Sequence, residues 1–219
     1  FAVITTILVN VISLILACAL NAKIKFKNTI KAFYFLPYML GRLIVGFIFN
    51  YIFANLIPQL GKGLGIKALS VNILGTNNAI WGIIAVSLWI GCAFNTLIYI
   101  AGLQNVSDDL IEAAQIDGAT WWKTLWKVKL PMVMPSITIC VFLTLTNSFK
   151  LFDQNLALTG GDPNHFTEML ALNIYQTFYA RAGAQWKGLG QAKAVLFCVL
   201  VIAISMIQLK ATRSREVQQ

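Results

Sequence analysis

Few side chains in this 219-residue chain have the types and spacing that enzyme chemistry requires. Its single histidine, His165, stands without a partner at a recognisable spacing and is expected to be a solvated loop residue. The stretch GKGLGIKALS lacks the G-x-x-x-x-G-K-[ST] spacing of a phosphate-binding loop. The cysteines are isolated in different apolar runs, which indicates packing residues: Cys18, Cys92, Cys140 and Cys198. We therefore expect no enzyme, no ATPase and no metal or cofactor site within this chain.

Polar and aromatic side chains within long apolar runs are candidates for binding a polar cargo. Sugars are recognised by aromatic rings against their C–H faces and by amides or acids at their hydroxyls. Hydrogen bonds between helices would explain buried amides nearly as well, so both explanations stay open. The candidates for a substrate pathway are Ser87, Phe94, Asn95, Tyr99, Asn147, Lys150 and Asp153.

Three cations near apolar runs need a separate account. Arg42, in PYMLGRLIVGF, either faces a cavity or snorkels to the cytoplasmic interface. Lys150 stands near the end of an apolar run, which favours an interfacial position, and Lys193 is expected to snorkel at the outer interface. If Arg42 and Lys150 both faced the cavity, an acidic sugar would become a candidate cargo.

The elements that position these side chains are predicted to be membrane-spanning helices. The composition, 58% hydrophobic and 11% charged, is typical of an integral membrane protein. Apolar runs long enough to cross a core of about 30 Å as helices lie at roughly 1–21, 33–55, 79–103, 131–150 and 188–209. They lack the period-2 alternation of barrel strands. The predicted fold is an all-α polytopic membrane helix bundle with five visible spans.

The net charge of +9 indicates topology and predicts no nucleic-acid partner. Basic residues gather in the first connection and in the tail: Lys23, Lys25, Lys27, Lys31, Lys210, Arg213 and Arg215. Such clusters favour the cytoplasmic side. Alternating spans then place 104–130 inside with the tail 211–219, and 56–78 and 151–187 outside. This parity puts Phe1 at the outer face, so we expect at least one further span before it.

The segment IEAAQIDGATWWKTLWKVKLP interrupts the apolar runs and is too short and polar to cross a bilayer. Ser107 or a neighbour can cap a helix that ends near Ile116, and Gly118 can take the left-handed conformation that stops it. Thr120 can then cap a second short helix, which Pro131 is predicted to end.

The predicted second helix has an aromatic and a basic face. Trp121, Leu125 and Val128 recur at helical spacing with Trp122 and Trp126 beside them, while Lys123 and Lys127 lie on another face. A helix lying among lipid headgroups would show the same pattern.

This segment resembles the E-A-A loop of permease subunits in binding-protein-dependent ABC importers, with the spacing E-A-A, three residues, G, nine residues, I-x-L-P. The matching positions are Glu112, Ala113, Ala114, Asp117, Gly118, Ala119, Leu130 and Pro131, with Val128 in place of Ile. LFDQNLALTGGDP is similar to the F-D…L-T-x-G-G-P signature of carbohydrate permeases of the maltose-permease type, with Asp162 inserted before Pro163. The likeness covers essentially the whole chain.

The resemblance implies a type I ABC importer transmembrane domain over residues 1–210, in a bacterial-type cell (inner) membrane with a cytoplasmic C-terminus. It implies a second permease subunit in a heterodimer, an ATPase dimer that binds ATP and Mg, and an extracellular binding protein that delivers a sugar or oligosaccharide. Trp121, Trp122 and Leu125 would contact the ATPase, while Glu112 and Gly118 would fix the shape of the loop. The alternatives are an ion-coupled secondary transporter and a non-transporting membrane scaffold.

Overall fold

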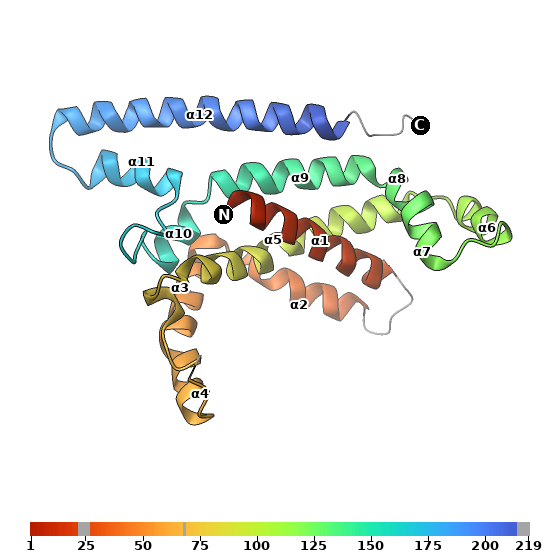
Figure 1. The fold of residues 1–219 in the computed structure, drawn as a ribbon, viewed down its shortest axis with the longest axis horizontal. Coiled ribbons are helices and arrows are strands. Elements are labelled where there is room, and N and C mark those ends of the chain that lie inside the picture. The colour runs from red at the N-terminus through yellow and green to blue at the C-terminus, as the bar shows by residue number, and fades with distance from the viewer. Residues whose placement is uncertain (22–26, 68, 214–219) are drawn as a thin grey trace.

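A computed structural model describes residues 1–21, 27–67 and 69–213 (Figure 1). Within these ranges the regular structure is helical and includes no strand, which confirms the all-α prediction. The predicted cytoplasmic residues Lys23, Lys25 and Arg215 lie outside the described ranges. The helices are α1 (Ala2–Asn21), α2 (Lys27–Met39), α3 (Arg42–Tyr51), α4 (Ile57–Gly63), α5 (Ala79–Gln104), α6 (Asp108–Ile116), α7 (Trp121–Thr124), α8 (Leu130–Met132), α9 (Met134–Phe149), α10 (Asp153–Leu158), α11 (Leu170–Tyr179) and α12 (Ala184–Arg213). The 3-10 turn η2 (Ile73–Gly75) precedes α5, and the π-helical turns η1 (Ile52–Leu56) and η3 (Leu125–Lys129) precede α4 and α8.

Several helices are suited to crossing a membrane, because their backbone groups are satisfied internally. Among the described residues, four stretches are long and apolar enough: Ala2–Asn21, Arg42–Gly63, Ala79–Gln104 and Ala184–Thr212. A fifth arises if Trp121–Met132 and Met134–Phe149, which meet at 69°, form one bent span. The predicted helix bundle is confirmed, and the predicted number of five spans is reached if this bent pair counts as one span.

The boundaries of the second predicted span were wrong. The apolar run 33–55 is divided, because α2 ends at Met39 and a new helix begins at Arg42 and continues through η1 to Gly63. Gly41, with φ 79°, makes the turn between them in a conformation that favours glycine. Hydropathy missed the break because apolar residues lie on both sides of it.

The end of the second short helix was also placed wrongly. Pro131 lies inside the continuous stretch Trp121–Met132, and the helix breaks at Val133 instead. A proline ring clashes with the carbonyl four residues earlier in an α-helix. The preceding turn η3 is widened to a π-helix, in which the Leu130 N–H donates to the Leu125 carbonyl, so Pro131 is accommodated.

The core of the molecule forms where α1 lies along α5 and α9. A buried cluster there includes Ala17, Tyr99 and Cys140. The Tyr99 hydroxyl donates to Asn10 Oδ1 at 2.6 Å, and Asn10 Nδ2 donates to the Thr6 carbonyl at 2.7 Å. These bonds satisfy polar groups that would be costly in a lipid environment. They tie α1 to α5 within the bundle.

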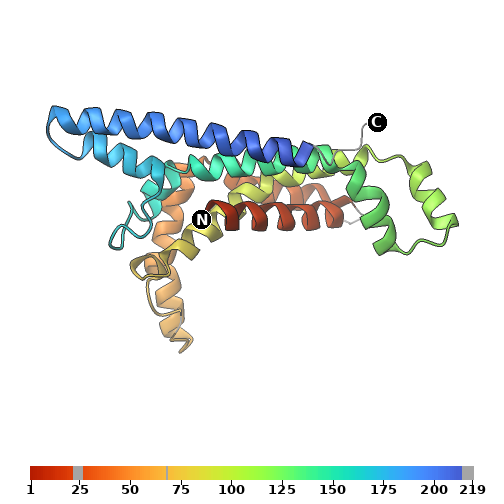
Figure 2. The same cartoon turned by 45° about the horizontal axis from the view of Figure 1, so that its top comes forward.

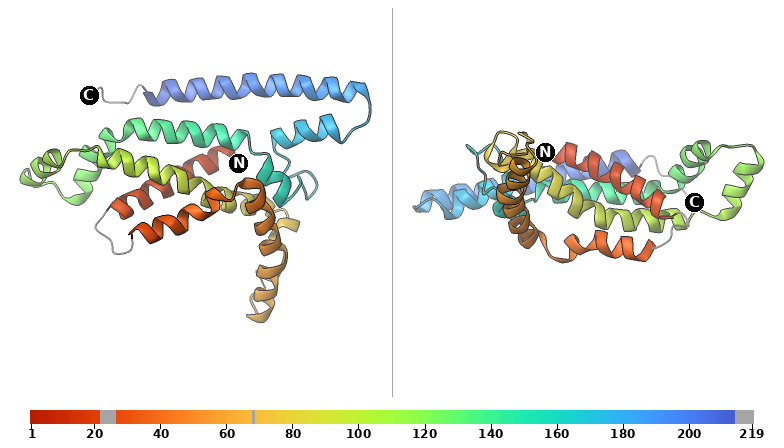
Figure 3. Two further views of the ribbon diagram at one scale, coloured as in Figure 1. Left: turned by 180° about the vertical axis from the view of Figure 1, so that it is seen from behind. Right: turned by 90° about the horizontal axis from the view of Figure 1, so that it is seen from below.

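The connections between helices lie at two opposite ends of the bundle. The α6–α7 hairpin projects from one end, where α1 ends, α2 begins and α12 ends (Figures 1 and 2). Short helices α10 and α11 lie at the other end, and α4 projects steeply away from the bundle (Figures 1 and 3). We call the α6–α7 hairpin, residues 107–130, the tip.

Candidate functional site

The turn of the tip follows from the backbone conformation of Gly118. Its φ is 74°, as the sequence predicts. The Gly118 N–H donates to the Gln115 carbonyl at 3.0 Å and the Ala119 N–H donates to the Ala114 carbonyl at 2.9 Å. This pair of bonds is the Schellman motif, which closes a helix on a left-handed residue. The spacing of Ala114, Gly118 and Ala119 therefore has a local structural cause.

The helix caps of the tip differ from one another. Thr120 caps the second helix, as predicted, because its hydroxyl accepts from the Lys123 N–H at 3.5 Å. Ser107 has the extended backbone of a cap position, but its side chain accepts no capping hydrogen bond. Among the described residues, the Glu112 carboxylate makes no hydrogen bond or ion pair. The shape of the hairpin thus depends on Gly118 and Thr120 rather than on Glu112.

Large apolar side chains are exposed at the tip. The exposed fractions are 86% for Ile116, 59% for Trp121, 64% for Trp122 and 65% for Trp126. The rings of Trp121 and Trp122 meet edge to face at 4.8 Å. Exposed apolar clusters of this kind occur at surfaces that contact another protein or a membrane. The other predicted residues of the loop are exposed (Glu112, Ala113, Asp117) or partly buried (Ala114, Ala119, Leu125, Pro131).

A bent helix joins the tip to the bundle. The stretch Trp121–Met132 meets α9 at 69°, and Val133 at the bend is 1% exposed within the buried core. Just beyond it, Ser136 packs on Gly102 of α5 so closely that a Cβ at Gly102 would lie 2.3 Å from its Oγ. The tip is therefore continuous with α9 through a bend that is packed in the core.

A cavity of about 320 Å³ lies among α1, α5 and α9 and is closed by parts of α2, α3 and α10. Four predicted pathway residues line it: Ser87, Phe94, Asn95 and Asn147. Its polar lining includes residues that were not in the predicted set: Thr5, Tyr38, Arg42, Thr144, Ser148 and Gln154. The cavity thus combines amides and hydroxyls with aromatic rings. The stacked rings of Tyr38 and Phe94 lie 5.5 Å apart with an interplanar angle of 13°.

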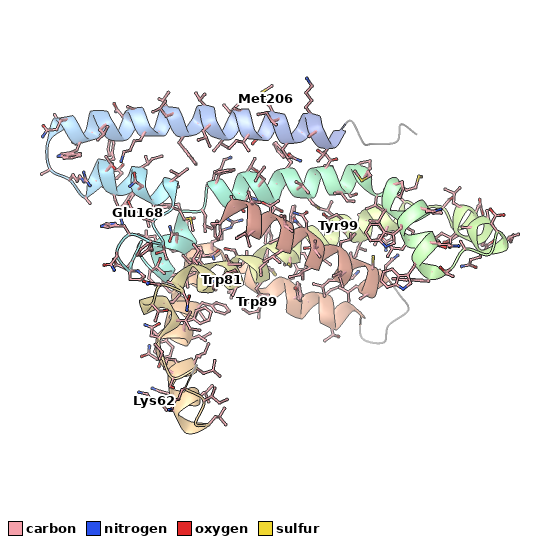
Figure 4. All side chains as sticks on the ribbon, viewed as in Figure 1. Lys62, Trp81, Trp89, Tyr99, Glu168 and Met206 are labelled. Atoms are coloured by element: carbon pink, nitrogen blue, oxygen red, sulfur yellow. The ribbon has the colours of Figure 1, made fainter. Side chains whose placement is uncertain are left out.

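The remaining predicted pathway residues lie elsewhere. Tyr99 is 1% exposed and points into the core of the bundle (Figure 4). Lys150 lines a different groove, of about 370 Å³, between α9 and α12, and Asp153 is exposed at the start of α10. These three side chains do not line the central cavity. Tyr99 lies on α5, which also contributes cavity residues, but on a face turned away from the cavity, and Lys150 follows the end of α9.

Gln154 is the cavity residue that sequence reasoning missed most completely. It is 1% exposed, and its Nε2 donates to Ser87 Oγ at 2.9 Å and to the Ile83 carbonyl at 3.2 Å. A six-residue polar helix such as α10 has the composition of a loop. No periodic pattern could have placed α10 against α3 and α5.

The outer signature LTGGDP forms a hydrogen-bonded turn beside α10. Gly160 and Gly161 have φ of 62° and 101°, and Thr167 Oγ1 donates to the Asp162 carbonyl at 2.6 Å. His165 is exposed in this loop, as predicted, and its Nδ1 lies 2.6 Å from Glu168 Oε2. Lys193 donates to Asn173 and Thr177 of α11 at 2.8 Å each, so it fastens α12 to α11 instead of snorkelling.

The sequence and this helical architecture agree with one family of known proteins. Residues 4–214 match the family described as binding-protein-dependent transport system inner membrane component. The chain belongs to this family. It is therefore a multi-pass membrane permease subunit with the type I ABC importer fold, and the ATPase of such a system is a separate subunit.

Several known proteins to which this permease is similar are named as permeases of transport systems. It is 41% identical, over 100% of its length and 74% of the relative, to the probable starch degradation products transport system permease protein AmyD of Thermoanaerobacterium thermosulfurigenes. It is 39% identical, over 94% of its length and 71% of the relative, to the multiple sugar-binding transport system permease protein MsmF of Streptococcus mutans. Identity to the maltose/maltodextrin permease MalF of Salmonella typhimurium is 28%, over 98% of this chain and 44% of that protein.

Proposed function

We propose that this permease conducts a sugar or oligosaccharide, delivered by an extracellular binding protein, through the central cavity. The names of its relatives, which refer to starch products, multiple sugars and maltodextrin, support a carbohydrate. The cavity lining supports it chemically, because amides and hydroxyls can bond sugar hydroxyls and the Tyr38–Phe94 pair can contact C–H faces.

We further propose that an ATPase dimer binds the tip on the cytoplasmic side of the membrane. The observation that carries this proposal is the exposed cluster of Ile116, Trp121, Trp122 and Trp126 on a hairpin joined to α9. A short helix with an aromatic face suits a groove on a partner. Because α9 contributes Asn147 and Ser148 to the cavity wall, movement of the tip would change the shape of the cavity.

The proposed orientation follows from charge. The tip carries the exposed Lys123 and Lys127 and lies at the same end as the start of α2 and the end of α12. Positive residues favour the cytoplasmic side. The ends of α10 and α11 would then face the binding protein, and a second permease would cover part of the exposed surface of α3, α4 and α12 in a heterodimer.

Gly118→Val tests the coupling role directly. No heavy atom lies within 4 Å of a Cβ at Gly118, so the substitution acts through its left-handed backbone and not through a clash. In proteoliposomes holding the whole importer, we expect ATP-driven sugar uptake to fall at least ten-fold while ATP hydrolysis continues. Gly118→Asn, which tolerates this conformation better, should retain more uptake.

The matched control is Gly63→Val at the end of α4, where a Cβ also meets open space but φ is not left-handed. It should leave uptake close to wild type. Normal uptake by Gly118→Val would refute the coupling role. Uptake driven by an ion gradient without ATP would refute the importer itself in favour of a secondary transporter.

A further inference from the structure

Arg42 is the one charged side chain among the described residues that line the central cavity. It is the first residue of α3 and is partly exposed, and the lining includes no acidic side chain from the described ranges. The sequence left open whether Arg42 snorkels or faces a cavity, and the structure places it in the cavity wall. The cavity therefore has a positive charge that its own lining does not neutralise.

The Arg42 guanidinium has no hydrogen bond or ion pair with any described residue. Asp153 interacts with it electrostatically, yet no carboxylate lies within the 4.0 Å of an ion pair, and Asp153 is exposed outside the lining. Arginine carries five donors in a planar fork that matches the two oxygens of a carboxylate or phosphate. These donors are free to bind a ligand.

A second polar group lining the cavity is also unpaired. Thr5 of α1 is 2% exposed, and its hydroxyl has no hydrogen-bond partner among the described residues. Asn147 and Ser148 line the same cavity from α9. Thr5 Oγ1 itself is enclosed by protein, so the exposed amide of Asn147 is a neutral polar group of the wall that a ligand can reach together with Arg42.

An uncharged sugar would suit this cavity poorly. When cargo displaces water, the guanidinium loses hydration, and a neutral sugar offers hydroxyls but no opposite charge. A sugar with an acidic group would pair with Arg42 while its ring packs against the stacked rings of Tyr38 and Phe94.

We propose that the cargo of this permease is a sugar that carries an anionic group, a carboxylate or a phosphate, which Arg42 recognises. This inference rests on the proposed transport function and narrows its substrate class. Arg42 is then the residue that determines specificity for charge, whereas the amides and hydroxyls of the cavity would serve neutral and acidic sugars alike.

Matched disaccharides separate charge from shape in the test. The purified importer complex in lipid nanodiscs, without the binding protein, is titrated with maltose, with maltose oxidised to the uronic acid at one C6, and with maltose 6′-phosphate. Binding is followed by the shift in melting temperature. We expect half-maximal stabilisation by the carboxylate or the phosphate probe at a concentration at least ten-fold below that of maltose.

Variants show which residue causes the preference for the anionic probes over maltose. Arg42→Gln should abolish it, so that maltose and both anionic probes act at similar concentrations, and Arg42→Lys should keep part of it, because a point charge replaces the fork. Asp153→Asn, which removes the nearby exposed acidic charge that interacts with Arg42, should preserve or strengthen it. Co-purification of the ATPase with each variant shows that the complex is intact.

Two results of the binding test would overturn the inference. One is a wild-type complex that prefers neither anionic probe to maltose, including one that binds none of the three sugars. The other is Arg42→Gln with its preference unchanged. A third result concerns transport itself. If the importer takes up a neutral sugar with ATP, and Gly118→Val lowers that uptake, the anionic cargo is refuted while the proposed transport function stands.

Discussion

At the residue scale, two polar side chains that were both predicted to line a substrate pathway lie in different surroundings. Tyr99 donates to Asn10 inside the α1–α5 contact and is 1% exposed. Asn147 lines the cavity, and no described residue accepts or donates a hydrogen bond to its side chain. Residues of this kind are easily confused in sequence, because both are polar groups at membrane depth. Their hydrogen-bond partners distinguish Tyr99, which ties two helices together, from Asn147, whose amide lines the cavity without a partner among the described residues.

Asn147→Ala and Tyr99→Phe should therefore affect different quantities. Asn147→Ala removes a free amide, so we expect sugar uptake to fall several-fold while the thermal stability of the complex stays within about 0.5 kcal/mol. Tyr99→Phe leaves Asn10 Oδ1 without its donor, which should lower the free energy of unfolding by about 1 kcal/mol and leave sugar affinity unchanged. Uptake assays and thermal melts measure both. The reverse pattern would contradict the assignment.

The residues of the tip that the sequence could predict are those that act on the backbone within a few neighbouring residues. Gly118 and Thr120 follow from backbone conformation and capping within a few residues, so spacing alone located them. The cavity depends on which face of each helix points inward, and apolar sequence carries no such signal inside lipid. Of the predicted residues, Ser87 and Asn147 line the cavity and Tyr99 does not, and Gln154 lines it without having been predicted.

At the element scale, the two π-helical turns occupy equivalent positions before a proline. η1 ends two residues before Pro58 and η3 ends two residues before Pro131. In each, an N–H donates to the carbonyl five residues earlier: Ile57 to Ile52 and Leu130 to Leu125. The wider turn lets the helix continue through a residue that would otherwise break it. It also fixes how the Trp-bearing face of the tip is rotated relative to α9.

Pro131→Ala tests whether that rotation matters. Alanine restores a backbone N–H, so η3 can relax to an α-helix, and stability should stay the same or rise by up to about 3 kcal/mol. The exposed tryptophans would then point in a different direction, and we expect weaker ATPase co-purification with lower uptake. Pro58→Ala changes the other π turn, away from the tip, and should spare both. Equal losses in the two variants would show a general folding defect instead.

At the scale of the whole molecule, burial is uneven between spans. About 56% of the most apolar segment of α5 is buried inside the protein, against 17% for that of Arg42–Gly63 and 11% for that of Ala184–Thr212. α5 is thus the centre of the bundle, while α3, α4 and α12 present apolar side chains outward, including Met206 (Figure 4). Apolar surface on this scale suits lipid and a partner permease. The long axis of the bundle then separates two polar ends.

Because the two polar ends of the bundle lie on opposite sides, chemical labelling of each end tests the orientation of the chain in the membrane. Lys62 lies on the projecting α4 (Figure 4). Lys123 lies on the tip, and both side chains are exposed. With a membrane-impermeant maleimide, Lys62→Cys should be labelled in intact spheroplasts, and Lys123→Cys only in inside-out vesicles. Cys198, in the middle of α12, should resist both treatments because it lies at membrane depth, and it provides the internal control. Labelling of Lys123→Cys from outside would invert the topology and remove the tip from reach of any cytoplasmic ATPase.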